Sequence, residues 1–165
     1  DAMNKAIAKA TGDYVLFLNA GDVFPSPDTL EMVAESVGDG EALPAVLYGD
    51  TDIVNEEGRF LRHRRLAAPR RLTWRSFMKG MLVCHQAFYA RTDLAKQTPY
   101  NLDYRRRLPM RNVGGVVVNF LDGGMTTANH RASLKERFRV MCRHYGFVPT
   151  CLMHVWFVVR SVTKK

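Results

Sequence analysis

The sequence predicts one α/β domain, with a sheet of several strands flanked by helices. Apolar runs rich in β-branched or aromatic residues recur at 15–18, 45–55 and 113–124. Segments with helical spacing separate them, and the connections are short. Such alternation is typical of a sheet covered by helices. A chain of 165 residues is long enough to bury a sizeable core.

The first half of the chain predicts two helices and three strands. Residues 1–10 have helical spacing, and Gly12 follows as a stop. Residues 15–18 form an apolar run without alternation, which favours a strand covered on both faces. Ser26 and Pro27 mark a helix start, and its apolar stripe comprises Leu30, Val33, Ala34 and Val37. A strand at 45–55, a turn and a basic return strand at 59–65 complete this half.

The second half predicts two more strands and three helices. Residues 72–81 read as a short helix, 84–91 as a strand and 113–124 as a strand rich in valine. Ser133 is placed to cap a helix that runs through His144 and ends at Gly146. Residues 149–161 form a last apolar helix with a basic tail. We therefore divide the chain into a core of 1–146 and a C-terminal amphipathic helix with its tail, 147–165.

The composition is that of a folded protein with a strong positive charge. The formal net charge is +8, seven arginines lie between Arg59 and Arg75, and a second group includes Arg105, Arg106, Arg107 and Arg111. Such clusters attract nucleic acid, anionic membranes or phosphorylated substrates, or they form a solvated basic face. Three scattered cysteines predict neither a disulfide framework nor a zinc site, so a reduced cytoplasmic location is expected.

Asp22 stands where the first apolar strand ends. In open α/β sheets, ligands bind beyond the carboxyl ends of strands. The carboxylate either holds a ligand at that edge or caps a turn before Pro25. The residues alone leave both readings open.

Four motifs in order extend the argument. They are DAMNKAIAKATGDYVLFLNAGDVF at 1–24, LYGDTDIVNEEGRF at 47–60, CHQAFYART at 84–92 and DGGMTTANH at 122–130. Together they resemble the family 2 glycosyltransferases of GT-A fold, the bacterial surface-polysaccharide type. The resemblance implies a Rossmann-like mixed sheet of the nucleotide-diphospho-sugar transferase kind. It also implies transfer of a sugar, UDP-linked in the first instance, to a saccharide or lipid-linked acceptor with inversion.

The resemblance also assigns site residues. Asp22 matches the last acid of the family's metal motif, so it is expected to bind Mg²⁺ or Mn²⁺, hard cations that prefer oxygen ligands. Donor or substrate binding is expected at Asp1, Asn4, Lys5, Asn19, Gly21, His85, Gln86 and His130. For His85 the alternative is a core histidine bonded to backbone, and for His130 it is an exposed surface residue.

The sequence departs from the family pattern in two places. The chain begins inside the helix before the metal motif, so the strands that hold the nucleotide base have no counterpart. No carboxylate lies between Asp103 and Asp122, where an inverting enzyme needs a general base. No catalytic residue is therefore assigned near Arg105–Arg107. We expect both segments to belong to a longer protein; the alternative is a degenerate, inactive relative.

The C-terminal segment suggests how the chain meets its surroundings. FVPTCLMHVWFVVRSVTKK, 147–165, combines apolar residues, a tryptophan and a basic end, which is typical of a helix at a membrane interface. Peripheral contact with the inner face of the membrane is expected, or packing of Val148, Leu152, Val155 and Val159 on the domain or in a homodimer.

The alternative functions are a basic nucleic-acid or polyanion-binding module and a non-catalytic glycosyltransferase remnant. Nucleic acid is the less expected partner, since no stacking aromatics are interleaved with the arginines.

Overall fold

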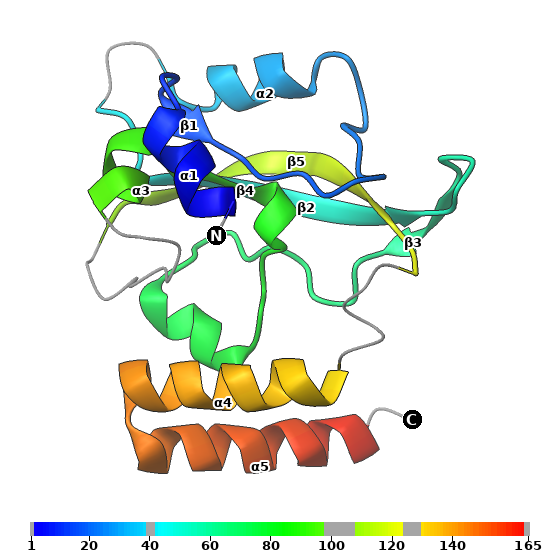
Figure 1. Ribbon diagram of the computed structural model, residues 1–165. Coiled ribbons are helices and arrows are strands. Elements are labelled where there is room, and N and C mark those ends of the chain that lie inside the picture. Colours follow the sequence, from blue (N-terminus) through cyan, green and yellow to red (C-terminus); the bar gives the residue numbers. More distant parts are fainter. Residues whose placement is uncertain (1, 39–41, 98–107, 124–129, 164–165) are drawn as a thin grey trace.

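A five-stranded mixed sheet with helices on both sides forms the molecule, as the computed structural model shows (Figure 1). The structure describes residues 2–38, 42–97, 108–123 and 130–163, but not the side chains of 130–133 and 161–163. Asp1, Asp103 and the segment Arg105–Arg107 lie outside the described residues. The predicted fold class is confirmed.

Strand β2, Val46–Val54, is the centre of the sheet. Strand β5, Met110–Leu121, runs parallel to it along one side. On the other side β2 pairs antiparallel first with β4, Phe88–Arg91, and then with β3, Phe60–His63. β1, Tyr14–Val15, joins the outer edge of β4. The parallel β2–β5 pair therefore carries two strand ends to the same edge of the sheet.

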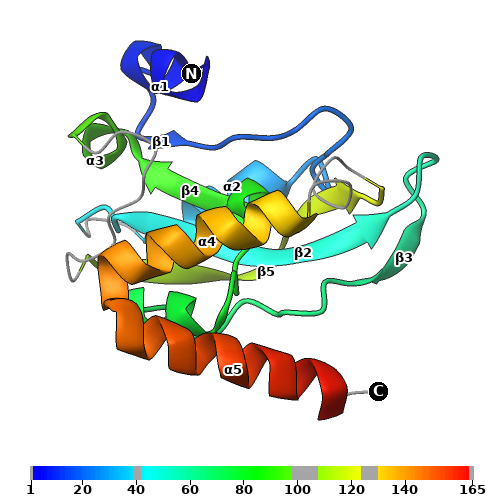
Figure 2. The same cartoon turned by 60° about the horizontal axis from the view of Figure 1, so that its bottom comes forward.

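The helices lie on both faces and in a separate pair. α1, Ala2–Lys9, packs beside α3, Thr92–Gln97, whereas α2, Thr29–Glu35, contacts β5. The 3₁₀ helices η1, Trp74–Lys79, and η2, His85–Ala87, lie between β3 and β4 in the chain. α4, His130–Tyr145, and α5, Phe147–Thr163, form an antiparallel hairpin on the side of the sheet opposite α2 (Figures 1 and 2).

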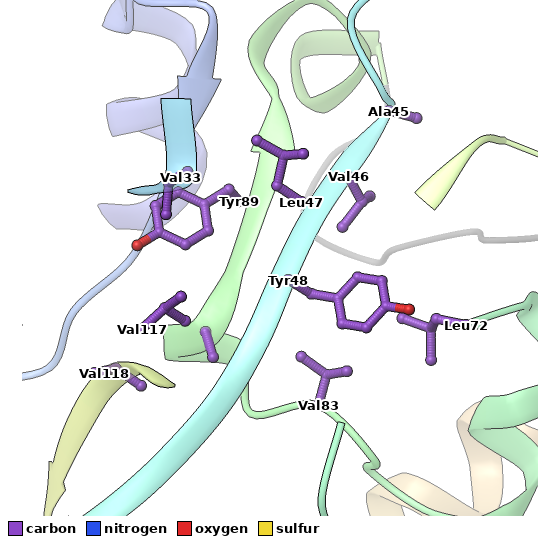
Figure 3. Close-up of a cluster of buried hydrophobic side chains, with 11 residues drawn as sticks. Val33, Ala45, Val46, Leu47, Tyr48, Leu72, Val83, Tyr89, Val117 and Val118 are labelled. Atoms are coloured by element: carbon purple, nitrogen blue, oxygen red, sulfur yellow. The ribbon is translucent and has the colours of Figure 1, made fainter. Parts of the chain in front are cut away.

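The core centres on β2, whose residues 46–48 are at most 4% exposed. Tyr48 is fully buried, yet its hydroxyl donates to the carbonyl of Pro69 at 2.9 Å, so its polar atom is satisfied. Figure 3 shows Val117 and Val118 of β5 and Val33 of α2 on one side of this cluster, with Leu72 and Val83 on the other. The central strand is thus held by packing on both faces.

Three predicted elements differ in kind or length from those observed. The strand expected at 15–18 pairs only at Tyr14 and Val15, because the chain then leaves β4 and runs to β5, where Val23 bridges Asn119. The strand expected at 84–91 begins with a 3₁₀ turn, His85–Ala87. The short helix expected at 72–81 is a 3₁₀ helix. α3 was not predicted.

Helix starts were the second weakness of the sequence prediction. α2 begins at Thr29 rather than at Ser26, because the Ser26 hydroxyl accepts from the amide of Asp28 and the Thr29 hydroxyl donates to the Ser26 carbonyl. These side-chain bonds hold a turn in place of the first helical turn. α4 starts at His130, so Ser133 lies inside the helix. α5 starts at Phe147, since Pro149 is tolerated in a first turn whose amides have no helical partner.

The apolar stripe of α5 does not pack against the rest of the described domain. Val148, Leu152, Val155 and Val159 are 53–66% exposed. Packing of this stripe on the domain, one of the two alternatives to membrane contact, is therefore wrong for the described residues, while a homodimer stays a prediction. No helix among the described residues is long and apolar enough to cross a bilayer. The division into 1–146 and 147–165 also stays a prediction.

Candidate functional site

Asp22 sits in a tight loop at the carboxyl end of β5. Its two carboxylate oxygens accept three hydrogen bonds: the Leu121 amide donates to Oδ1 at 3.1 Å, and the Gln86 side-chain amide and the Asn19 amide donate to Oδ2 at 3.0 and 3.3 Å. The three donors come from β5, η2 and the loop itself. The carboxylate is therefore fixed by groups far apart in sequence.

The loop approaches β5 closely because Gly21 has no side chain. Gly21 has φ +92°, and a Cβ there would lie 2.6 Å from Cδ2 of Leu121. Val23 and Asn119 then exchange two backbone hydrogen bonds of 3.1 and 2.8 Å. This pair of hydrogen bonds to β5 sets the position of Asp22 at the edge of the sheet.

Gln86 is the buried member of the site. It is fully buried; its Nε2 donates to Asp22, and its Oε1 accepts from the Cys84 thiol at 2.7 Å. Burial raises the pKa of Cys84, so its thiol stays protonated and serves as this donor. The amide is thereby oriented with its donor end toward the carboxylate.

His85 lies beside this cluster without bonding to it directly. Burial lowers the pKa of His85, while the negative charge of Asp22 raises it and Arg64 lowers it further. Arg64 is held by the carbonyls of Leu66, Leu82 and Met81 at 2.6–3.2 Å, so its charge is fixed nearby. The neutral imidazole is thus the favoured form. Its role at sugar or acceptor stays a prediction.

The other carboxylates at this end of β2 and β5 already have partners. Oδ1 of Asp122 lies 3.3 Å from a terminal nitrogen of Arg62, with which it forms an ion pair. Oδ1 of Asp52 lies 2.7 Å from Nδ1 of His63. Asp50 accepts from the Ala68 amide at 2.7 Å. In the described part of the chain, Asp22 forms no ion pair with a basic side chain. Unlike Asp52 and Asp122, it is therefore not already paired with a basic side chain in that part of the chain.

The donor set of Asp22 tests whether a divalent metal fits. A carboxylate offers about four acceptor positions, and three are used, so one remains on Oδ1. One protein oxygen is enough for Mg²⁺, which keeps waters and takes further oxygens from phosphates. The described residues contain no group of three or more His, Cys, Asp or Glu side chains that could hold a metal. Asp22 thus fits a metal completed by substrate oxygens.

The structure brings only part of the predicted residue set together. Asn19, Gly21, Asp22, His85 and Gln86 meet at the end of β5. Asn4 and the exposed Lys5 lie on α1, which packs beside α3 at the other end of the segment leading to Asp22 (Figure 1). Asp1 lies outside the described residues, as does the side chain of His130, the first residue of α4.

Two contributors were missed from the sequence. The backbone amide of Leu121 binds Asp22 across 99 positions of chain, and Cys84 orients Gln86. A main-chain donor leaves no residue-type signal. Cys84 could have been noticed from its place directly before the His85-Gln86 pair.

Comparisons with known proteins decide the family. The model named Glycosyl transferase family 2 matches residues 1–97, which is more than half of the chain. The chain belongs to glycosyl transferase family 2. A mixed sheet with flanking helices is consistent with the GT-A fold of that family. The match includes the Asp22 loop and the Gln86 turn, which the structure joins.

Curated mycobacterial proteins are similar to this chain over part of their length. A "PGL/p-HBAD biosynthesis glycosyltransferase" of Mycobacterium bovis (strain BCG / Pasteur 1173P2) is 38% identical over 106 residues, and one of Mycobacterium tuberculosis (strain ATCC 25177 / H37Ra) matches equally. An uncharacterized glycosyltransferase of M. tuberculosis (strain CDC 1551 / Oshkosh) is 33% identical over 107 residues. These matches cover 63–64% of this chain but only 38% of each relative.

Replacing Gln86 with glutamate is expected to lower the free energy of unfolding by about 1–3 kcal/mol, because a fully buried donor becomes an acceptor facing Asp22. Urea denaturation measures the loss. The matched control is Gln97→Glu, the same change at an exposed position in α3, expected to stay within about 0.5 kcal/mol. Equal losses in both variants would contradict the bonding described for Gln86.

The lowered pKa of His85 predicts a pH-dependent stability. The unfolded side chain takes up a proton near its ordinary value of 6.5, while the folded one does so only at lower pH. The contribution of neutral His85 is therefore complete above that value and is lost as the pH falls toward the folded-state pKa. We expect His85→Gln to weaken the fall in unfolding free energy between about pH 7 and about pH 5. Identical pH profiles by urea denaturation would contradict this.

Proposed function

We propose that this chain carries the metal- and diphosphate-binding part of a nucleotide-sugar-dependent glycosyltransferase. The observation that carries the proposal is the fixed Asp22 carboxylate, which has one free acceptor position and no ion pair in the described part of the chain. UDP is the nucleotide expected by family resemblance. Mg²⁺ or Mn²⁺, when bound, supplies positive charge that neutralises the departing diphosphate.

The chain's own residues act by orientation. The amides of Leu121 and Gln86 hold the Asp22 carboxylate, leaving Oδ1 with the open position, and such outer partners commonly fix the geometry of metal ligands. Gly21 keeps the loop low against Leu121. Asn19 is exposed beside the carboxylate, and its side chain is accessible to a bound nucleotide sugar.

The acceptor and the stereochemistry are part of the same proposal. A saccharide or lipid-linked acceptor attacks with inversion, and a general base takes its hydroxyl proton. Relatives named for PGL/p-HBAD biosynthesis make acceptors from that biosynthesis the first to screen, ahead of those for cell-surface polysaccharides. The cysteine content favours a setting on the cytoplasmic side of the membrane.

A donor screen tests the proposal. The full-length protein is titrated calorimetrically with UDP-, GDP- and TDP-sugars with Mn²⁺ and with a chelator, and hydrolysis of each nucleotide sugar is followed. Metal-dependent binding of at least one donor is expected. Absence of binding to any donor would overturn the proposal in favour of a non-catalytic remnant.

The polyanion-binding alternative rests on the exposed arginines of 59–75, six of which lie on the surface; they are Arg59, Arg62, Arg65, Arg70, Arg71 and Arg75. Oligonucleotide binding that weakens steeply with salt, together with no donor binding, would favour it.

A further inference from the structure

A cationic pocket lies where the helical hairpin meets the segment between β3 and η1. Its volume is about 200 Å³. Four of its lining side chains are basic and none is acidic; they are Arg65, Lys79, Arg137 and Arg160. The lining residues come from four separate stretches of the chain, so the fold itself assembles the charge. It shares no residue with the Asp22 site.

The two central cations of the pocket are positioned on aromatic rings. The guanidinium carbon of Arg137 lies 4.9 Å from the ring centre of Phe157, and that of Arg160 lies 4.6 Å from that of Trp156. Such contacts fix the direction of a guanidinium. Burial lowers the pKa of Arg137, and the charge of Arg160 lowers it further. Two like charges are therefore held close together in a half-buried place.

The described part of the chain pairs no carboxylate with these cations. Backbone also approaches closely at Gly80, where an added Cβ would lie 3.3 Å from a terminal nitrogen of Arg137. Forked arginines with an uncompensated charge are suited to phosphate, whose oxygens accept several charge-assisted hydrogen bonds at once.

An apolar stripe lies on α5, the helix that also supplies Phe157 and Arg160 to the pocket. Val148, Leu152, Val155 and Val159 recur at helical spacing on one face and are 53–66% exposed. Trp156, 41% exposed, lies between this stripe and Arg160 on the helix. Figure 1 shows α5 on the side of α4 away from the sheet, and α5 also contacts η1. Residues 147–165 contain no Asp or Glu.

We propose that this face docks on an anionic phospholipid surface, with a lipid phosphate in the Arg65–Lys79–Arg137–Arg160 pocket and the α5 stripe among the acyl chains. Apolar burial beside clustered cations is how interfacial helices bind anionic bilayers. A two-fold dimer through the stripe would leave the four cations of the pocket without a role, because none of them belongs to the stripe. The proposal is independent of the Asp22 chemistry.

Vesicle flotation of the full chain tests the proposal. Binding is expected to vesicles containing phosphatidylglycerol and to be at least about tenfold weaker for phosphatidylcholine alone. Arg137→Gln with Arg160→Gln is expected to weaken binding about tenfold or more, at about 1 kcal/mol for each charge near the surface. The matched control, Arg70→Gln with Arg71→Gln, removes two exposed arginines outside the pocket and is expected to weaken it less than about threefold.

The apolar part is tested separately. Leu152→Ser, at a position 66% exposed, is expected to weaken vesicle binding about threefold or more, while Leu61→Ser, at a 48% exposed position on β3, changes it little. Circular dichroism confirms that each variant keeps its helices.

Three outcomes would overturn the proposal. Equal loss in the pocket pair and the control pair would show general charge attraction without a pocket. Calorimetric binding of soluble glycerol phosphate that depends on Arg137, without vesicle binding, would assign the pocket to a free phosphate ligand. A dimer in analytical ultracentrifugation that Leu152→Ser dissociates, again without vesicle binding, would assign the stripe to a second copy. None of these measurements uses a sugar donor, so their failure and that of the proposed transferase activity are distinguishable.

Discussion

Replacing Asp22 with asparagine is expected to lower donor turnover at least about 100-fold, the scale for removing one group that stabilises developing charge. Asparagine keeps the shape of the side chain but loses the anionic oxygen that a hard cation prefers. Its NH₂ group would also face either the Leu121 amide or the Gln86 amide, both of which are donors. Turnover of the donor found by the screen, measured across a Mn²⁺ titration, checks this result.

The control for Asp22 is Asp13→Asn, which makes the same charge change at an exposed position before β1. It is expected to keep wild-type turnover. If Asp22→Asn shifts only the unfolding free energy and leaves the Mn²⁺ dependence unchanged, Asp22 is a loop cap, the alternative that the sequence left open. The two readings are separable because capping and cation binding use different lone pairs of the same carboxylate.

The sequence predicted the order of most elements because the apolar periodicity is local information. β2 was expected at 45–55 and observed at Val46–Val54, and α1 at 1–10 and observed at Ala2–Lys9. The 3₁₀ turn at His85–Ala87 was predicted as strand, since its apolar and aromatic continuation into Phe88 resembles one. That turn matters, because it directs the Gln86 amide toward Asp22.

The candidate site was predictable in its named side chains but not in its assembly. The motif containing Asp22 and the motif containing Gln86 are recognisable one by one. Their contact across 64 positions, and the contact of Asp22 with the Leu121 amide, depend on how the sheet is ordered. Residue types do not encode that order. The basic pocket was likewise not predictable, since its arginines are scattered in the sequence. Arg65, Arg137 and Arg160 come together only because the α4–α5 hairpin packs on η1.

Replacing Gly49 with alanine is expected to lower the free energy of unfolding by about 1–3 kcal/mol, the usual cost of overpacking a filled interior. An added Cβ would lie 2.6 Å from the Gly115 carbonyl oxygen and 2.7 Å from Cγ1 of Val117. Both obstacles belong to β5, the long parallel neighbour of β2. Neither is the end of a flexible side chain, so the strands themselves must separate.

The crowding at Gly49 arises from irregular pairing of the two central strands. The register shifts between Tyr48 and Asp50, where β5 has extra residues between Asn112 and Val116, and again between Asp50 and Thr51, where it has one between Val116 and Val118. The same pairing fixes where β5 places Asn119 and Leu121, the residues that hold the Asp22 loop. Gly49→Ala is therefore expected to weaken donor binding as well as stability.

Urea denaturation and donor titration of the same samples measure both effects of Gly49→Ala. The matched control is Gly12→Ala, where the nearest atom to an added Cβ is the Tyr14 carbonyl oxygen at 3.8 Å. That variant is expected to keep its stability within about 0.5 kcal/mol and to bind donor normally. Loss of stability in Gly49→Ala with unchanged donor affinity would mean that the Asp22 loop keeps its position without the native β2–β5 contact, and the link between sheet register and site would be wrong.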